Sequence, residues 1–541
     1  MKELINAYNK ESDTTNTKII FMAAASGIAQ SCLICIISVV AETAYDTGLS
    51  FQYLMMYLTA FIIFYIGKRY TLFESISVVE KILNRMRIRI SDKLRQTELD
   101  FIESIRKEDL NTKYQYNINV ISEFVPELVN GFQSLIVVIF CLVYILLLSG
   151  LGFLCTISTL GIAISMYLLH DKTYKMQLKE TNALKTGFSQ VFNDAIDGFK
   201  ELKLNQHKSD KHFNKITNYS DRLEQINVSV NKLFAIDLMY SQITFFFLLA
   251  IIGFLLPLYG EHHSELIMHL IAAILFLIGP LGRVVGSIPQ LFKTNVCFEE
   301  IYQFEQILDQ SIHQDVPTYK DNIIPMKDFK QILFKGIEFY YGNKEDPMFS
   351  VGPIDLTLNY GEILLISGGN GSGKSTLLKL ITTLYFPDKG QILIDGTPLS
   401  KNLYPGYRSL FTAVFADFHL FEELYTMDII DDEKINQLLQ KMNLDKKTTV
   451  ANGKYSNINL STGQKKRLAM VNSLLEDRSI FIFDEWAADQ DPIFKDYFYT
   501  VMLKELQNAG KTVVAVTHDD RYFDCGDRLI KMEFGKIISR D

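Results

Sequence analysis

The sequence predicts a chain of two parts, an α-helical membrane domain followed by an α/β domain. The first part contains long apolar runs, whereas the second alternates short apolar runs with polar, helix-like segments. A glycine-rich loop directly follows one of these short runs. The chain has 541 residues, of which 48% are hydrophobic, so it exceeds one ordinary domain. We expect a membrane domain over residues 1–305, a linker over 306–330 and the α/β domain over 331–541.

Six apolar stretches are long enough to cross a membrane as helices. A hydrocarbon core of about 30 Å requires roughly 20 apolar residues in a helix. The first stretch is longer than the apolar core of a signal peptide, so we expect it to be an uncleaved first span. The stretches are residues 18–42, 50–67, 128–149, 151–170, 233–259 and 265–289.

The connections between the spans alternate between short turns and long segments. The turns at 42–48, 149–152 and 260–264 contain no Lys or Arg, whereas the long segment that follows the second span is rich in both. Positive residues stay on the cytoplasmic side of a membrane. We therefore expect the long segments, both termini and the α/β domain on the cytoplasmic side.

The two long segments, 68–126 and 171–232, have helical periodicity and few Gly or Pro residues. They are predicted to continue the membrane helices into the cytoplasm. The turns at their tips, near 103–111 and 186–198, are candidates for contacts that couple the two domains. The alternative is a pair of solvated helical hairpins without a coupling role.

Charge and cysteine content argue against two other classes of protein. The net charge of −8 lacks the basic footprint of a nucleic-acid binder. The six cysteines form no disulfide framework, and most lie in apolar runs, where Cys behaves as a small hydrophobe. Cys32 and Cys35 form a C-x-x-C pair inside the first span, which we interpret as packing.

The glycine-rich loop has the composition and context of a phosphate-binding loop. It follows the apolar segment 363–367, a predicted buried strand, and opens a helix. Its glycines let backbone N–H groups close around phosphate oxygens, and the helix N-terminus favours negative charge. We expect Lys374 to reach the β- and γ-phosphates and the Ser375 hydroxyl to ligate Mg²⁺. The other predicted nucleotide-binding residues of this segment are Gly368, Asn370, Gly371, Ser372, Gly373 and Thr376.

A second apolar strand, 480–484, ends in two adjacent acids. Asp484 is placed as the carboxylate that holds Mg²⁺, directly or through water. Glu485 resembles the catalytic glutamate of the ABC ATPases, which acts as general base on the attacking water. The alternative is an acidic strand end that merely caps a helix. His518 follows a third apolar run and matches the histidine that contacts the γ-phosphate in that family.

The segment 460–464, LSTGQ, resembles the signature that defines the ABC family. In that family the signature of one subunit contacts the nucleotide held by the phosphate loop of the other. The resemblance therefore implies ATP as ligand, a second half-transporter as partner, and roles for Ser461, Thr462, Gly463, Gln464 and the aspartate of the loop between the subunits, Asp491. Tyr341 resembles the aromatic that stacks on adenine, although Tyr340 is also a candidate.

The chain departs from the common family pattern at 416, where Ala416 replaces the glutamine that contacts Mg²⁺. Alanine has no ligand atom, so either water or Asp417 is expected to substitute. Thr462 also replaces the usual glycine, and the acidic stretch that commonly precedes the signature is missing.

The segments 414–421 (VFADFHLF), 484–492 (DEWAADQDP) and 198–205 (GFKELKLN) look like one subgroup of the family. It is the bacterial cyclic-peptide and siderophore exporters of the pyoverdine and syringomycin transporter type. The resemblance implies a six-span exporter domain (type IV) joined to an ABC nucleotide-binding domain. It also implies a homodimer in the bacterial inner membrane that exports a peptide-like product. A multidrug or lipid exporter is the alternative.

Overall fold

The structure, a computed structural model, divides into two compact units. One contains Met1–Leu94 and Ile105–Asp309, and the other contains Arg95–Ser104 and Gln310–Asp541. We call them the helical unit and the α/β unit. The residues that the structure describes are 17–46, 51–104, 107–259, 264–312, 316–317, 323–343, 346–425 and 431–540.

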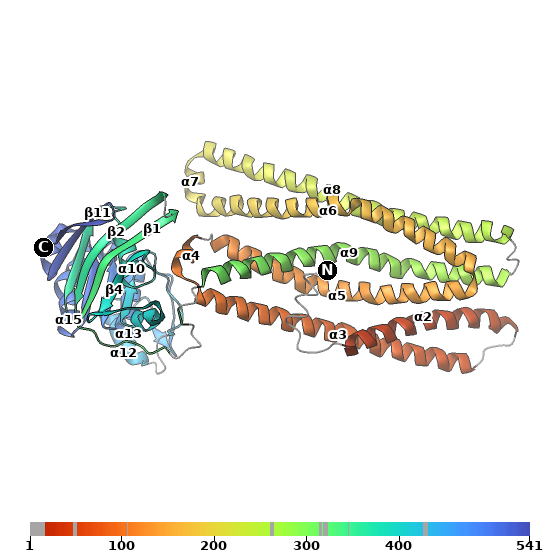
Figure 1. Cartoon of the computed structure of the whole chain (residues 1–541), viewed down its shortest axis with the longest axis horizontal. Helices are drawn as coiled ribbons and strands as arrows, with labels where there is room; N and C mark the ends of the chain where they lie inside the picture. The colour runs from red at the N-terminus through yellow and green to blue at the C-terminus, as the bar shows by residue number, and fades with distance from the viewer. Residues whose placement is uncertain are drawn as a thin grey trace. The chain divides into compact units, whose positions relative to one another are not determined.

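Long helices make up the helical unit (Figure 1). They are α2 (Thr17–Asp46), α3 (Phe51–Gln96), α5 (Lys107–Leu148), α6 (Gly150–Asp197), α8 (Gln206–Ala250) and α9 (Ser264–Ser311), with α7 (Phe199–Leu204), η1 (Ile251–Leu255) and η2 (Leu256–Tyr259) as short pieces between them. At 1.5 Å per residue, the 46 residues of α3 extend about 70 Å, more than twice the apolar thickness of a bilayer. The predicted continuation of membrane helices beyond the bilayer is therefore confirmed.

Five helical segments of the described chain are long and apolar enough to span a membrane, namely Thr17–Val40, Phe51–Gln96, Tyr114–Leu148, Gln206–Leu255 and Leu266–Ser311. A shorter apolar segment, Gly150–Ser165, begins α6 at the place of the predicted fourth span. Most of the predicted turn at 260–264 lies outside the described residues.

Apolar packing among α5, α8 and α9 forms the core of the helical unit. Ile145, Leu248 and Leu277 are fully buried there. Many apolar side chains point outward instead, among them Leu147 and Phe254. In a bilayer such outward side chains contact lipid, so they carry no cost there.

The second predicted tip, 186–198, begins too early and reaches the observed turn only at its last residue, Gly198. Helix α6 continues through Asp197, Gly198 ends it, and α7 forms the tip between α6 and α8 (Figure 1). Within the predicted turn, a Cβ atom at Gly187 would lie 2.6 Å from Cε1 of Tyr219 on α8. Gly187 therefore serves close packing of α6 against α8 and does not break the helix.

The α/β unit contains two larger sheets. The first is antiparallel in the order β2 (Asp346–Asn359), β1 (Gln331–Asn343), β4 (Lys389–Ile394) and β5 (Thr397–Pro398). The second has the order β12 (Lys536–Arg540), β11 (Arg528–Glu533), β3 (Ile363–Gly368), β10 (Thr512–Val516), β9 (Ile480–Asp484) and β6 (Phe411–Val414). A small hairpin joins β7 (Val450–Ala451) to β8 (Lys454–Tyr455).

Helices surround these sheets. They are α4 (Leu99–Ser104), α10 (Lys374–Ile381), η3 (Lys401–Leu403), α11 (Tyr404–Arg408), α12 (Asp432–Lys441), α13 (Thr462–Glu476), η4 (Trp486–Asp489), α14 (Pro492–Tyr497), η5 (Phe498–Met502), α15 (Leu503–Asn508) and η6 (Asp520–Cys525).

Strands β3, β10 and β9 lie next to one another and run parallel. All five residues of β9 and of β10 are buried, as expected of strands that are covered on both faces. Because parallel strands end at the same edge of a sheet, the three loops that follow them meet there. These loops begin at Gly369, Glu485 and Thr517.

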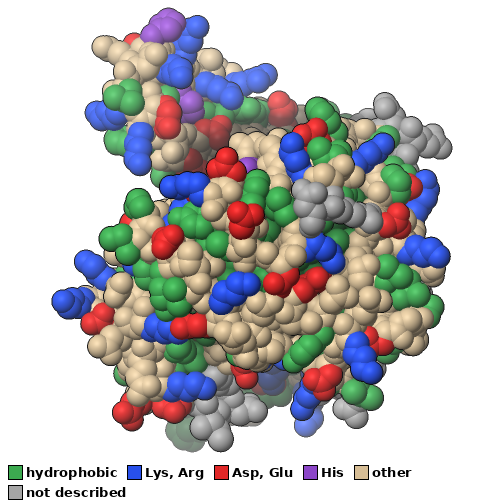
Figure 2. Space-filling model, turned by 90° about the vertical axis from the view of Figure 1, so that its left-hand side faces the viewer, with side chains coloured by type: hydrophobic (Ala, Val, Ile, Leu, Met, Phe, Trp, Pro, Cys, Tyr) green, Lys and Arg blue, Asp and Glu red, His purple; other side chains and the backbone are tan. Residues whose placement is uncertain are grey.

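The surface of the α/β unit mixes charges of both signs (Figure 2). Its ion pairs include Lys441 with Glu505, whose Nζ and Oε2 atoms are 2.7 Å apart with both side chains partly exposed. Exposed pairs of this kind contribute roughly 0–1 kcal/mol each. The stability of this unit therefore comes mainly from its two large buried clusters, which lie on either side of the six-stranded sheet.

Candidate nucleotide site

The phosphate loop connects β3 to α10, as predicted. Gly371 and Gly373 have φ angles of 73° and 99°, which side chains with a Cβ atom rarely adopt. A Cβ atom at Gly368 would lie 2.4 Å from the carbonyl oxygen of Met532. The loop conformation therefore requires glycine at these positions. Ser372, Lys374 and Thr376 are buried, whereas Asn370 and Ser375 are exposed.

Lys374 folds back over this loop. Its Nζ atom donates to the carbonyl oxygens of Gly368 at 3.1 Å and Gly369 at 2.9 Å, and lies 3.8 Å from Oε1 of Glu485. Burial lowers the pKa of Lys374, while Glu485 and Asp484 act in the opposite direction. The loop thus holds an ammonium group over its own backbone at the N-terminus of α10, which suits a phosphate ligand.

Asp484 ends β9 and is 2% exposed. Burial raises its pKa, and the Ser375 hydroxyl, Lys374 and the Ala416 N–H counteract this effect. Its Oδ1 atom is buried without a hydrogen-bond partner among the described residues. An unpaired buried carboxylate oxygen is costly, and a cation bound beside the Ser375 hydroxyl would satisfy it. Asp484 and Ser375 therefore fit the predicted Mg²⁺ site.

Ala416 approaches this carboxylate only through its backbone N–H. It cannot replace the missing glutamine side chain. Asp417 is exposed and makes no ion pair with any part of the chain that the structure describes.

Glu485 and His518 meet at the sheet edge, where Nε2 of His518 lies 2.7 Å from Oε1 of Glu485. Glu485 has a φ angle of 50°, an uncommon conformation for a residue with a side chain. Such strained residues persist only where the surroundings hold them in place. Both side chains are partly exposed, with 34% and 39% of their surfaces accessible, so water can reach the carboxylate.

Lys466 on α13 holds the backbone of Glu485, a contact that we did not predict. Its Nζ atom donates to the Glu485 carbonyl oxygen at 2.7 Å and lies 2.7 Å from Oδ2 of Asp489. The side chain is only 5% exposed. In return, Nε1 of Trp486 donates to the Lys466 carbonyl oxygen at 2.8 Å. Hydrogen bonds donated from each side therefore connect α13 to the segment that follows β9.

The signature begins α13. Its first residue, Ser461, precedes the helix, and the Ser461 N–H donates to Oε1 of Gln464 at 3.1 Å in a capping box. A Cβ atom at Gly463 would lie 2.5 Å from the Asp489 carbonyl oxygen, so the helix can approach this loop only with glycine there. Ser461 and Thr462 are exposed.

Asp491 caps α14 by accepting a hydrogen bond from the Phe494 N–H at 2.9 Å. Its Oδ2 atom also accepts from Nη2 of Arg467 on α13 at 2.5 Å. The Phe494 N–H, followed by the Arg467 guanidinium, lowers the pKa of Asp491. Asp491 is thus part of the link between the signature helix and the loop after β9.

Tyr341 and Tyr340 point in different directions. The Tyr341 hydroxyl lies 3.0 Å from Oγ1 of Thr376 on α10, which places Tyr341 beside the phosphate-loop helix. The Tyr340 hydroxyl instead contacts Glu338 and Lys389. This placement favours Tyr341 as the aromatic near the site, and its role in adenine stacking stays a prediction.

The first predicted tip, 103–111, overlaps the short helix α4 of the α/β unit only at residues 103–104. Residues 105–106 lie outside the described residues, and 107–111 begin α5 of the helical unit. Nζ of Lys379 on α10 lies 2.7 Å from Oε1 of Glu103, and Tyr385 donates to the same carboxylate. Burial, together with Glu103, raises the pKa of Tyr385 well above its usual range. Because the Tyr341 hydroxyl lies 3.5 Å from that of Tyr385, a chain of polar contacts joins α4 to the phosphate-loop helix.

Comparisons with known proteins agree with this geometry. Residues 351–488 match the ABC transporter family model, and residues 17–281 match the ABC transporter transmembrane region. The ATP-binding protein SyrD of Pseudomonas syringae pv. syringae is 32% identical over 85% of this chain and 83% of its own length. An ATP-dependent lipid A-core flippase of Burkholderia orbicola is 21% identical over 85% of this chain and 78% of its own length.

The fold has a close counterpart among solved structures, a bacterial Atm1-family ABC exporter with ATP bound. It superposes with a TM-score of 0.77 at 15% identity, over 100% of this chain and 94% of the other. The chain therefore belongs to the ABC transporter family, as an exporter half-transporter in which a multi-pass membrane domain is driven by its own ATP-hydrolysing domain.

Proposed function

We propose that this half-transporter exports a peptide-like product from the cytoplasm across the bacterial inner membrane. The similarity to SyrD over most of both chains is the observation that carries the proposal. The export protein SyfD, described as a probable syringafactin exporter, is 28% identical over 37% of this chain, which supports the same class of cargo.

We propose that two copies of the chain form the transporter and that each nucleotide lies between them. The exposed Ser461 and Thr462 are available to a second copy, and Lys374, Glu485 and the signature are all present in one chain. Both sites of a homodimer would then be complete. In each site the phosphate loop of one copy would bind ATP, and the signature N–H groups of the other would contact its γ-phosphate.

Within one such site, Lys374 would exchange its loop carbonyls for the β- and γ-phosphates. Asp484 and Ser375 would hold Mg²⁺, which supplies charge neutralisation on the phosphates when bound. Glu485 would accept a proton from the attacking water, and His518 holds the Glu485 carboxylate in place at 2.7 Å. Closure of the two α/β units would reach the membrane helices through α4, which the Glu103 contacts attach to α10.

A lipid exporter is the second candidate. It is favoured by the lipid A-core flippases among the relatives, two of which match 85% and 79% of this chain. Their identities of 21% and 24% are lower than that of SyrD.

The test compares culture supernatants and cell extracts of the wild-type strain and a Glu485→Gln strain by untargeted mass spectrometry. Gln keeps the shape of Glu485 but cannot act as a base, so ATP should bind without turnover. We expect a peptide-like species to disappear outside and accumulate inside. An unchanged peptide profile together with altered membrane lipids would transfer the assignment to lipid export.

A further inference from the structure

A cavity of about 300 Å³ lies among the helices α5, α6, α8 and α9 of the helical unit. Each of the four helices contributes polar or charged side chains to its wall. We propose that this cavity binds the carboxylate and the adjoining amide groups of a peptide-like cargo. The proposal rests on the proposed function, because it specifies which chemistry of the cargo the membrane domain recognises.

Two lysines provide the anion-binding part of the cavity. Lys185 on α6 lies with Nζ 5.7 Å from the centre of the Tyr116 ring, and Lys293 on α9 lies 5.4 Å from the centre of the Phe124 ring. Neither ammonium group forms a salt bridge with any described residue. Aromatic faces attract cations but do not neutralise them, so both charges remain available to a ligand.

Both lysines line the same cavity, and Glu123 is the acidic side chain among its described lining residues. Two cations face one carboxylate, so the described wall carries a surplus of positive charge. A carboxylate bound between Lys185 and Lys293 would interact favourably with both ammonium groups.

Three asparagines supply the amide-binding part. Asn182 comes from α6, and Asn227 and Asn231 lie one turn apart on α8. Their side-chain amides make no hydrogen bond within the described chain. An amide group offers both donors and acceptors and therefore matches the N–H and C=O groups of a peptide. A phosphate headgroup could accept hydrogen bonds from the amide N–H groups, but it offers no N–H donor to the amide oxygens.

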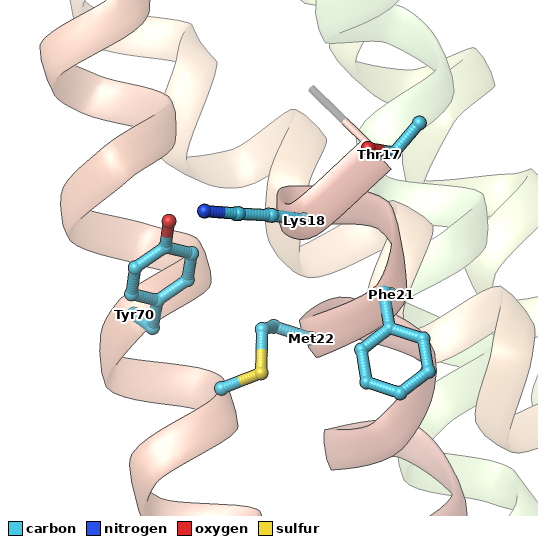
Figure 3. A pocket seen from close by; sticks show the side chains of 5 residues that line it. All are labelled: Thr17, Lys18, Phe21, Met22 and Tyr70. Carbon is cyan, nitrogen blue, oxygen red and sulfur yellow. The ribbon is translucent and has the colours of Figure 1, made fainter. Parts of the chain in front are cut away.

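A second cavity among the described residues of the helical unit lacks this combination. It lies at the start of α2 against α3 and is lined by Thr17, Lys18, Phe21, Met22 and Tyr70 (Figure 3). Lys18 extends toward Tyr70, while Phe21 and Met22 form an apolar wall (Figure 3). One lysine beside aromatic and apolar groups is typical of a helix end at a membrane interface and does not point to a ligand.

The test measures binding of a fluorescent N-acyl tripeptide with a free C-terminal carboxylate to the purified full-length protein in phosphatidylcholine nanodiscs. The same peptide with a C-terminal amide removes the carboxylate alone. A lysophosphatidate of equal chain length, added as competitor, tests whether the cavity binds a lipid phosphate in place of a peptide carboxylate. Lys179→Gln is the matched control variant, because Lys179 lies on α6 outside the cavity wall.

We expect the Lys185→Gln, Lys293→Gln double variant to bind the carboxylate probe about tenfold more weakly or worse, as hydrogen bonds to charged groups imply. Lys179→Gln should bind like the wild type, and Lys293→Arg, which keeps the charge, should retain most of the affinity. The amide probe should bind the wild type weakly, with little difference between variants.

Equal affinity of the wild type and the double variant for the carboxylate probe would overturn the proposal. So would stronger competition by the lysophosphatidate than by unlabelled carboxylate peptide. Either binding result would overturn only the assignment of this cavity if the Glu485→Gln strain still retains a peptide-like product inside the cell. If no peptide is retained, the proposed function itself fails, whatever the probes do.

Discussion

Replacing Lys466 by methionine isolates what one buried ammonium group contributes to ATP hydrolysis. Methionine keeps an unbranched side chain of similar length and loses the charge and the donors. In the native chain Nζ of Lys466 contacts the Glu485 carbonyl oxygen and Oδ2 of Asp489, each at 2.7 Å. The variant therefore releases the backbone of the proposed general base without touching its carboxylate.

The expected magnitude follows from these two contacts. A hydrogen bond to a charged group contributes about 1.5–3 kcal/mol. The Asp489 side chain is 46% exposed, so water replaces most of what it loses. The free energy lost is then chiefly that of the hydrogen bond to the Glu485 carbonyl oxygen. If the transition state for hydrolysis loses this stabilisation, kcat decreases by about 10- to 100-fold, because 1.4 kcal/mol corresponds to a factor of ten.

The assay measures kcat and KM for ATP, together with Tm, on the purified full-length protein. We expect the decrease in kcat with little change in KM, because Lys466 contacts no predicted nucleotide-binding group. Lys441→Met is the matched control, since Lys441 makes an equally short contact with Glu505 on the exposed surface. A Lys466→Met protein with unchanged kcat and a lower Tm would show that the contact serves stability alone and does not position Glu485 for catalysis.

Three further changes test other parts of the site. Glu103→Gln removes the charge that Lys379 pairs with, and we expect basal ATP hydrolysis to persist while its stimulation by transported cargo decreases severalfold; equal stimulation would contradict a coupling role for α4. Gly463→Ala places a Cβ atom 2.5 Å from the Asp489 carbonyl oxygen, so turnover should fall by tenfold or more; a normal rate would show that the helix shifts freely. Ala416→Gln restores the family's usual side chain beside Asp484, and we expect a lower Mg²⁺ concentration at half-maximal activity; an unchanged Mg²⁺ dependence would show that this departure is neutral.

The core of the nucleotide site could be predicted from sequence because each of its parts follows a buried parallel strand. Gly368 ends β3, and Glu485 and His518 follow β9 and β10. The apolar runs indicated these strands, and the structure confirms them. Since neighbouring parallel strands end at one edge, strand order alone brings these residues together. The glycines that the phosphate loop requires can also be recognised in the sequence as part of a motif.

Contacts that depend on packing between distant segments could not be predicted in this way. Lys466 stands among three consecutive basic residues, and only the helical period, with buried Ala469 and Met470 on the following turn, hints that it faces inward. Glu103 and Tyr385 are far apart in the chain, and neither carries a motif. Their contact depends on how α4 packs in the α/β unit, which no local pattern encodes.

The position of the second tip was missed for a related reason. Gly187 can be recognised in the sequence as a flexible residue, but only the nearby Tyr219 ring shows that it is needed for close helix packing. The predicted range 186–198 reaches the observed turn only at its last residue, Gly198, where the backbone N–H of Gly198 bonds to carbonyl groups of the last turn of α6.

ATP-driven export of a peptide-like product is tested most directly by measuring uptake into inverted inner-membrane vesicles that contain either the wild-type chain or Glu485→Gln. The vesicles are supplied with cytosolic extract of the producing strain, and their contents are analysed by mass spectrometry. We predict that a peptide-like species accumulates only with ATP, Mg²⁺ and the wild-type chain. Accumulation that does not depend on ATP, or that is the same with Glu485→Gln, would contradict it.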